Sequence, residues 1–169
     1  ENIVLETKRG IIGNLIGNHE SILEKLGSRH METGSLIVYT TGDSNLEIAA
    51  HEDIVPVNEL YHYAEIIRHI TYKDEWKVGR VIARPFTGED KHFKFTNNTR
   101  IFTLTPPNKS VLDELKDNNY QVISIGKIND IYNGKGITKI IKSTDNNEGI
   151  NKLTDIMDKN FEGLCYLNL

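Results

Sequence analysis

The pattern of apolar and polar positions along the chain predicts alternating strands and helices. Residues 35–40 form a continuous apolar run, which is typical of a strand covered on both faces. Residues 78–83 are interpreted as a strand that Arg84-Pro85 closes, since Pro cannot donate to a ladder. The clearest helix starts near Asn58, because the residues after it form one buried stripe: Leu60, Tyr63, Ala64, Ile67 and Ile70.

Weaker signals complete the first half. Glycines punctuate residues 11–18, which are interpreted as a loop, and residues 21–26 are expected to form a short helix that Gly27 ends. Residues 88–98 are polar and are interpreted as a second loop.

The second half begins at Pro106-Pro107, the clearest boundary in the chain. The pattern after it predicts a helix at 110–116, a strand at 122–125, a tight turn at 133–136, a helix from about Asn147 and a strand at 164–167. This alternation indicates a mostly parallel α/β layer, whereas the first half has a more mixed pattern. The last helix is expected to turn its apolar residues inward: Ile150, Leu153, Ile156 and Met157.

The composition is that of an ordinary globular chain. Of the 169 residues, 38% are hydrophobic and 26% are charged, which excludes the disordered class. The net charge of −4 provides no field that would attract nucleic acid or an anionic membrane. The single cysteine, Cys165, cannot form an internal disulfide, and no apolar run is long enough to span a bilayer. We therefore expect a cytoplasmic protein that binds neither nucleic acid nor membranes.

The two ends of the sequence favour a fragment. The chain starts at Glu1 rather than at Met, and it ends on the strand-like run 161–169. Such a strand normally leads into a loop that carries function, so we expect the chain to be a piece of a longer protein.

Polar residues at two strand ends are the first candidates for a ligand site. Residues 40–44 follow a buried strand, at the position where open α/β sheets bind ligands. The carboxylate of Asp43 suits a pair of sugar hydroxyls, and the alternative is that it caps a helix running to about His51. In the second half, Lys127 follows a strand and a glycine; its cation suits a phosphate, and the alternative is a solvated surface lysine.

Two arginines near the strand 78–83 are the other candidates for anion binding. Arg80 or Arg84 can hold a phosphate with two parallel hydrogen bonds, although the solubility of an edge strand explains one such arginine equally well. The histidines lack the spacing of a zinc site, and neither a nucleophile–base pair nor an acidic metal cluster is recognisable. The residues alone therefore predict a polar site of sugar-phosphate size on an α/β scaffold.

One long block and six shorter blocks carry a resemblance to an enzyme family. Residues 36–52 read Leu-Ile-Val-Tyr-Thr-Thr-Gly-Asp-Ser-Asn-Leu-Glu-Ile-Ala-Ala-His-Glu. This segment resembles bacterial phosphopentomutases, which have a Thr-Ser-Ala-Asp-Ser core followed by Ile-Ala-Ala-His-Glu. The shorter blocks follow the family's order with compatible spacing, at 30–34, 59–61, 78–86, 111–116, 125–131 and 161–169.

The resemblance implies an isomerase of nucleotide metabolism. Phosphopentomutases belong to the alkaline phosphatase superfamily, and they interconvert ribose or deoxyribose 1-phosphate and 5-phosphate through a phosphothreonine and two Mn²⁺ ions. It implies an α/β fold in which a mixed-sheet cap domain at 1–104 is followed by a βα segment of the core at 105–169. The family's threonine and metal ligands lie outside the matched stretch. The chain is therefore expected to bind a pentose phosphate, to need the remainder of the enzyme's core as its partner, and to be inactive alone.

The resemblance also implies substrate contacts, and it assigns no catalytic or metal-binding residue to this chain. The implied contacts are the sugar-hydroxyl contacts Thr41 and Asp43, the phosphate contacts Arg80 and Lys127, Ile82 beside the ribose, and Asn45 where the family usually has a small aliphatic residue.

The sequence departs from the family pattern in one arginine-bearing loop. Phe95 and Thr99 occupy positions where the family has arginines. Lys94 and Arg100 are candidates to compensate for the loss of these two positive charges. Residues 138–151 depart as well. The alternatives are therefore a non-catalytic sugar-phosphate-binding module, a degenerate homologue, or another mutase or phosphatase of the same superfamily.

Overall fold

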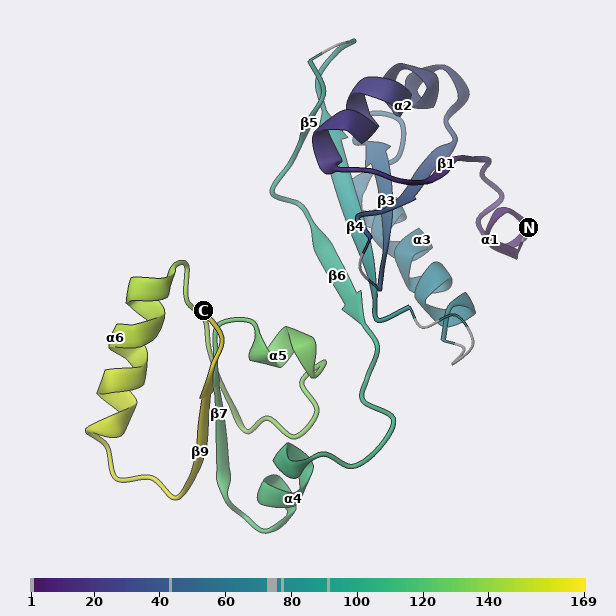
Figure 1. Ribbon diagram of the computed structural model, residues 1–169. Helices are drawn as coiled ribbons and strands as arrows, with labels where there is room; N and C mark the ends of the chain where they lie inside the picture. The colour runs from purple at the N-terminus through teal and green to yellow at the C-terminus, as the bar shows by residue number, and fades with distance from the viewer. Residues whose placement is uncertain (1, 43, 73–75, 77, 91) are drawn as a thin grey trace. The chain divides into compact units, whose positions relative to one another are not determined.

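The protein is a mixed α/β structure, as predicted, made of two compact units. A computed structural model describes residues 2–42, 44–72, 76, 78–90 and 92–169 (Figure 1). The first unit is Glu1–Leu104 and the second is Thr105–Leu169.

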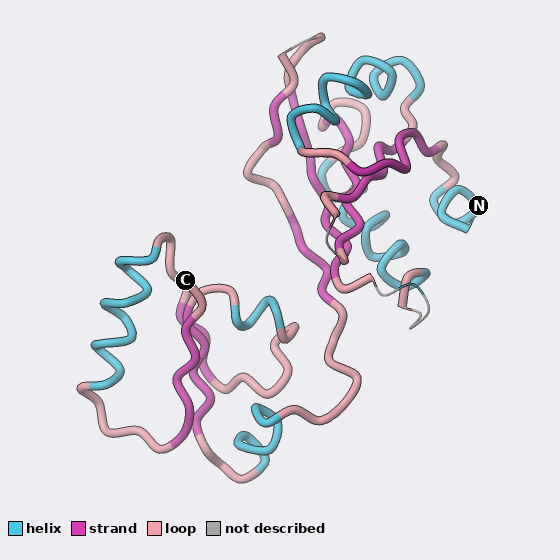
Figure 2. The backbone as a smooth tube through the Cα atoms, in the orientation of Figure 1, coloured by secondary structure: helices cyan, strands magenta, loops and turns pink. Residues whose placement is uncertain are grey.

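The first unit is built around a mixed sheet. Its elements are α1 (Asn2–Thr7), β1 (Ile11–Ile16), α2 (His19–Thr33), β2 (Leu36–Thr40), β3 (Asn45–His51), α3 (Val57–Ile70), β4 (Arg80–Thr87), β5 (Lys94–Phe95) and β6 (Arg100–Thr103). The strands β1, β2, β3 and β4 lie side by side in chain order, and β5 and β6 both pair with β4 (Figure 2). The β1–β2 and β3–β4 pairs are parallel, and the other pairs are antiparallel.

Helices cover the two faces of this sheet. Alternate residues of a strand point to opposite faces, so register partners on neighbouring strands share a face. On the α3 face, Leu60, Ala64 and Ile67 of α3 pack against strand residues such as Ile48 and Val81. On the α2 face, buried residues of α2 pack with strand residues: Ile22 and Leu23 with Ile37, Tyr39, Ala49 and Phe86. The stripe predicted from Asn58 onward is thus confirmed for Leu60, Ala64 and Ile67, with Tyr63 partly buried against the same core, whereas Ile70 is outside this cluster.

The predicted loop at 11–18 and the predicted helix end at Gly27 were wrong. Residues 11–16 form β1, and Gly13 and Asn14 have positive φ (96° and 55°) at a bulge in its pairing with β2. Gly27 lies inside α2, which continues to Gly34, a left-handed C-cap. A Cβ on Gly27 would lie 2.4 Å from the ring of Phe93, so the glycine is there for close packing.

The predicted helix ending at His51 was also wrong. Residues 45–51 form β3, in which Leu46, Ile48 and Ala50 face α3 while Glu47 faces α2. Asp43, the expected cap, lies outside the described residues.

The strand β4 is longer than expected and passes through Pro85. This residue lies between the segment that pairs with β6 and the segment that pairs with β5, where no antiparallel partner needs its missing N–H. The loop interpretation of 88–98 missed the short strand β5.

The second unit has the parallel α/β layout that the sequence predicted. Its elements are α4 (Val111–Asp117), β7 (Gln121–Ile125), α5 (Ile128–Ile131), β8 (Lys139–Ile141), α6 (Asn146–Met157) and β9 (Gly163–Leu167). The strand order is β8-β7-β9, and both pairs are parallel. The inward stripe predicted for the last helix was wrong in part, because Ile156 is buried while Ile150 and Met157 are exposed.

No helix within the described ranges is both long enough and apolar enough to cross a membrane.

Candidate functional site

Four of the six expected contact residues lie near one end of the sheet in the first unit. Asn45 opens β3 and Arg80 opens β4, and the register pairs these two residues directly. Ile82 follows two positions later on β4 and therefore shares their face. Thr41 follows β2 by one residue, and its hydroxyl contacts Glu47 of β3. All four thus belong to the α2 face.

These residues differ in how much of their hydrogen-bonding capacity is used. Arg80 is exposed, and its guanidinium makes no hydrogen bond or ion pair with any described residue. Asn45 is half-buried; its Oδ1 atom is fully buried and has no hydrogen-bond partner in the described part of the chain. Ile82 is only 4% exposed and supplies an apolar surface next to them. A cation, an amide and an apolar side chain in adjacent register positions suit a phosphorylated polar ligand.

Glu47 occupies the centre of a polar cluster on the same face. Its side chain is 1% exposed, and a buried carboxylate is stable only when it is paired and hydrogen-bonded. Arg84 Nε donates a hydrogen bond to Glu47 Oε2, and the Tyr39 hydroxyl donates to the same oxygen at 3.1 Å. The Thr41 hydroxyl donates to Glu47 Oε1 at 3.4 Å. The carboxylate therefore uses both oxygens within the protein.

The cluster extends to α2 through His19. His19 Nδ1 lies 3.0 Å from the Tyr39 hydroxyl oxygen and 3.6 Å from Glu47 Oε2. Because the Tyr39 proton is donated to Glu47, we assign the Nδ1 proton of His19 as the donor to the phenol oxygen. Burial raises the pKa of Tyr39, and the nearby Glu47 charge raises it further, so the phenol is protonated and available as a donor.

Arg84 is not available as an independent phosphate ligand. Its guanidinium pairs with Glu47 and also lies over the ring of Phe95, 5.9 Å from the centroid. The expectation that either Arg80 or Arg84 can hold an anion is therefore narrowed to Arg80.

Arg100, one of the two residues expected to compensate for the missing loop arginines, lies on the other face of the sheet. Arg100 pairs in register with Ala83, so it points to the α3 face, where it lies 5.2 Å from the ring centroid of Tyr61 and 3.9 Å from Glu65. Phe95 instead pairs with Phe86 and lies on the α2 face, against His19 and Arg84. An apolar ring thus covers the polar cluster where the family has an arginine.

Lys127 lies in the second unit, directly after β7. Gly126 has a φ of +76°, and a Cβ on it would lie 2.5 Å from the backbone oxygen of Asn168, so only glycine fits at this turn. Lys127 itself is exposed and precedes the four-residue helix α5. Its participation in a site with Arg80 stays a prediction, because each unit is described separately.

Two buried histidines of the first unit have structural hydrogen bonds. His30 Nδ1 donates to the Ser35 carbonyl at 2.6 Å, and its Nε2 accepts the backbone N–H of His51 at 2.9 Å. His51 Nε2 contacts the Gly88 carbonyl at 3.0 Å. These hydrogen bonds of the two rings hold α2, β3 and the end of β4 together. We therefore assign both histidines a structural role and not a ligand-binding one.

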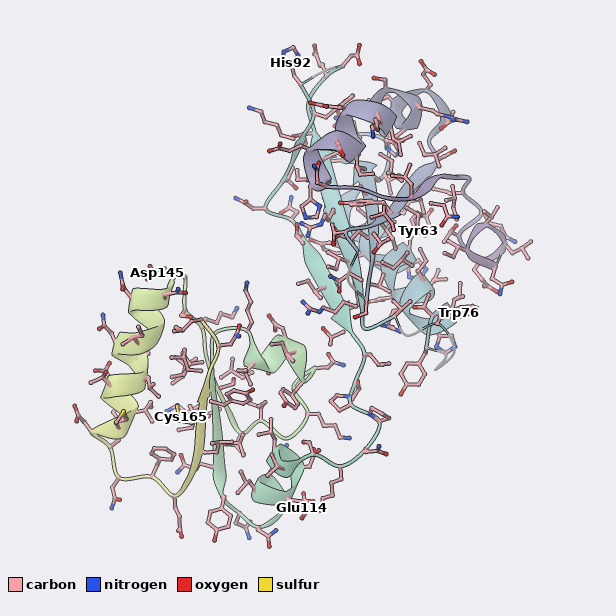
Figure 3. All side chains as sticks on the ribbon, in the orientation of Figure 1. Tyr63, Trp76, His92, Glu114, Asp145 and Cys165 are labelled. Carbon is pink, nitrogen blue, oxygen red and sulfur yellow. The ribbon has the colours of Figure 1, made fainter. Side chains whose placement is uncertain are left out.

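The residues present do not fit a manganese site. Among the described residues, no group of three or more His, Cys, Asp or Glu side chains is arranged to hold a metal ion. Cys165 is on the side of β9 that faces α6 (Figure 3), and burial raises the pKa of its thiol. A packing role explains this cysteine.

Comparison with models of known protein families finds no match for this chain. The functional assignment therefore depends on the geometry above. The sequence analysis missed Glu47, Tyr39 and His19; the available signal was the charged Glu47 inside an otherwise apolar run from Leu46 to Ala50.

Proposed function

We propose that the α2 face of the first unit binds a pentose phosphate, as the substrate-binding part of a cytoplasmic phosphopentomutase. Arg80 holds the phosphate, Thr41 contacts a sugar hydroxyl, and Ile82 packs beside the ring. The reaction is the transfer of a phosphate between C1 and C5 of ribose or deoxyribose. The nucleophile and the Mn²⁺ ions that the resemblance implies belong to the remainder of the enzyme's core, and no step assigned to this chain passes through a metal.

The observation that carries the proposal is the direct register of Asn45 with Arg80. These two residues, together with Thr41 and Ile82, were expected from the resemblance to touch one small ligand. Their placement at one end of one sheet face supports that expectation, because strand register is independent of the resemblance. Oδ1 of Asn45 adds support, because it is buried without a hydrogen-bond partner among the described residues and such an acceptor needs one.

The test is a titration of the chain with ribose 5-phosphate, followed by calorimetry or by NMR shifts of the Arg80 side chain. We expect saturable binding that Arg80→Met weakens about tenfold, the size of one charge-assisted hydrogen bond. Arg100→Met is the matched control, because Arg100 lies on the opposite face of the same sheet. The control should leave the affinity within about twofold of the wild type.

Two results would contradict the proposal. Equal losses in Arg80→Met and Arg100→Met would mean that the face has no specific role. Conversion of ribose 5-phosphate by the chain alone, in the presence of Mn²⁺, would mean that the chemistry does not depend on the remainder of the core. A chain that binds but never supports turnover when joined to a phosphopentomutase core would favour the non-catalytic module.

A further inference from the structure

Two arginines of β4 lie on the α2 face, and they differ in exposure and in ion pairing. Arg84 is 21% exposed and paired with the buried Glu47, whereas Arg80 is exposed and unpaired among the described residues. They are four residues apart on one strand, so their stems point to the same side. Of these two guanidinium groups, only that of Arg80 is unpaired among the described residues.

Glu47 also determines how the Thr41 hydroxyl can be used. A hydroxyl has one proton, and Thr41 donates it to Glu47 Oε1. What Thr41 offers outward is a pair of acceptor lone pairs. An acceptor suits a sugar hydroxyl, which can donate, and it does not suit the ionised oxygens of a phosphate, which only accept.

We propose that Glu47 is a positioning residue that sets ligand orientation and selectivity on this face, an inference that rests on the proposed function. By pairing with Arg84 and accepting the Thr41 proton, Glu47 removes both from competition for the phosphate. The phosphate is left to Arg80, and the sugar hydroxyl is directed to Thr41. The face thereby selects a sugar monophosphate over inorganic phosphate.

The experiment measures the affinities for ribose 5-phosphate and for inorganic phosphate in the full chain and takes their ratio. Glu47→Gln keeps the size of the side chain but releases Arg84 from its ion pair. We expect the affinity for inorganic phosphate to rise about tenfold, the size of one charge-assisted hydrogen bond, so that selectivity falls by the same factor. Adding Arg84→Met to Glu47→Gln should restore the selectivity, which a merely structural role of Glu47 would not produce.

Glu65→Gln is the matched control, because Glu65 also pairs with an arginine, Arg100, but on the α3 face. It should leave the ratio unchanged. Thr41→Val gives a second test that leaves the Glu47–Arg84 ion pair in place, because it removes only the hydrogen bond from the Thr41 hydroxyl to Glu47 Oε1. This variant should weaken the binding of ribose 5-phosphate and leave that of inorganic phosphate unaltered.

The outcomes separate the two proposals. If the wild-type chain does not bind ribose 5-phosphate, the proposed function fails and this inference fails with it. If it binds, but Glu47→Gln keeps the wild-type ratio, the inference alone is overturned. If Glu47→Gln does not fold, Thr41→Val decides: equal weakening of both ligands would show that Thr41 donates to phosphate and would overturn the inference.

Discussion

Lowering the pH should destabilise the first unit through His30. This ring is fully buried, and burial lowers its pKa from the ordinary 6.5, with the electrostatic effects of His51 and Arg9 acting in the same direction. The hydrogen bond to the Ser35 carbonyl opposes the shift but does not reverse it. Because Nδ1 donates and Nε2 accepts, a second proton on Nε2 would face the N–H of His51.

The sign and the size follow from proton linkage. Below pH 6.5 the unfolded chain binds a proton at His30 that the folded chain does not, so the stability present above pH 6.5 is lost as the pH falls. Between pH 7.5 and pH 5.5 one such histidine accounts for a loss of about 1.4 kcal/mol when its folded form stays neutral.

The assay is urea unfolding at both pH values, followed by the fluorescence of Trp76, which is the only tryptophan of the chain and lies in the first unit. His30→Gln is the comparison, because it cannot gain a charge. We expect the wild type to lose more than this variant on acidification, by up to about 1.4 kcal/mol, the limit for a histidine that stays neutral when folded. Equal losses in the two proteins would refute the reasoning, and so would an NMR titration of His30 with a midpoint at or above 6.5.

Two further substitutions test the packing and the capping. Gly27→Ala should lower the free energy of unfolding by about 1 kcal/mol, because the clash with Phe93 outweighs the higher helix propensity of alanine. Gly149→Ala in α6 should be neutral or stabilising, because the nearest atom to the new methyl is the flexible end of Leu167 at 3.2 Å. The reverse order in thermal unfolding would contradict this account. Ser110→Ala should cost the second unit about 1 kcal/mol, because it removes the capping box of α4, and an unchanged circular dichroism melting curve would count against that role.

Sequence periodicity predicted the elements in which the apolar residues of a regular pattern are the ones that the fold buries. The stripe at 58–70 forms one side of a core, and the apolar runs at 36–40 and 121–125 are central strands with neighbours on both sides. In these segments the local pattern and the tertiary environment agree, so the pattern was sufficient.

The errors occurred where a residue's role depends on a distant partner. Residues 45–51 alternate correctly for a strand on the α3 face, but the other face carries the charged Glu47, which the sequence analysis could not place in a core. The ion pair with Arg84, which is 37 residues away, and the hydrogen bond from Tyr39 compensate for that burial. Gly27 was interpreted as a helix end because its packing against Phe93 is likewise invisible in the local sequence.

The candidate site likewise depends on partners that are distant in the sequence. Thr41, Arg80 and Ile82 were identified residue by residue from the resemblance, but nothing in the sequence specifies that Asn45 and Arg80 are register partners. Register is set by the strand pairing of the whole sheet, and a slip of one residue would turn Arg80 to the α3 face. The division of roles between Arg80 and Arg84 could not be predicted for the same reason.

Pro85 divides one edge of β4 into two separately paired segments. The proline separates two short pairings, one with β6 at residues 80–83 and one with β5 at residues 86–87. The connection between β5 and β6 can therefore gain or lose residues without shifting the register that presents Arg80. A protein built in this way can change which side chains cover this face of the sheet over evolutionary time while the strand beneath stays in place.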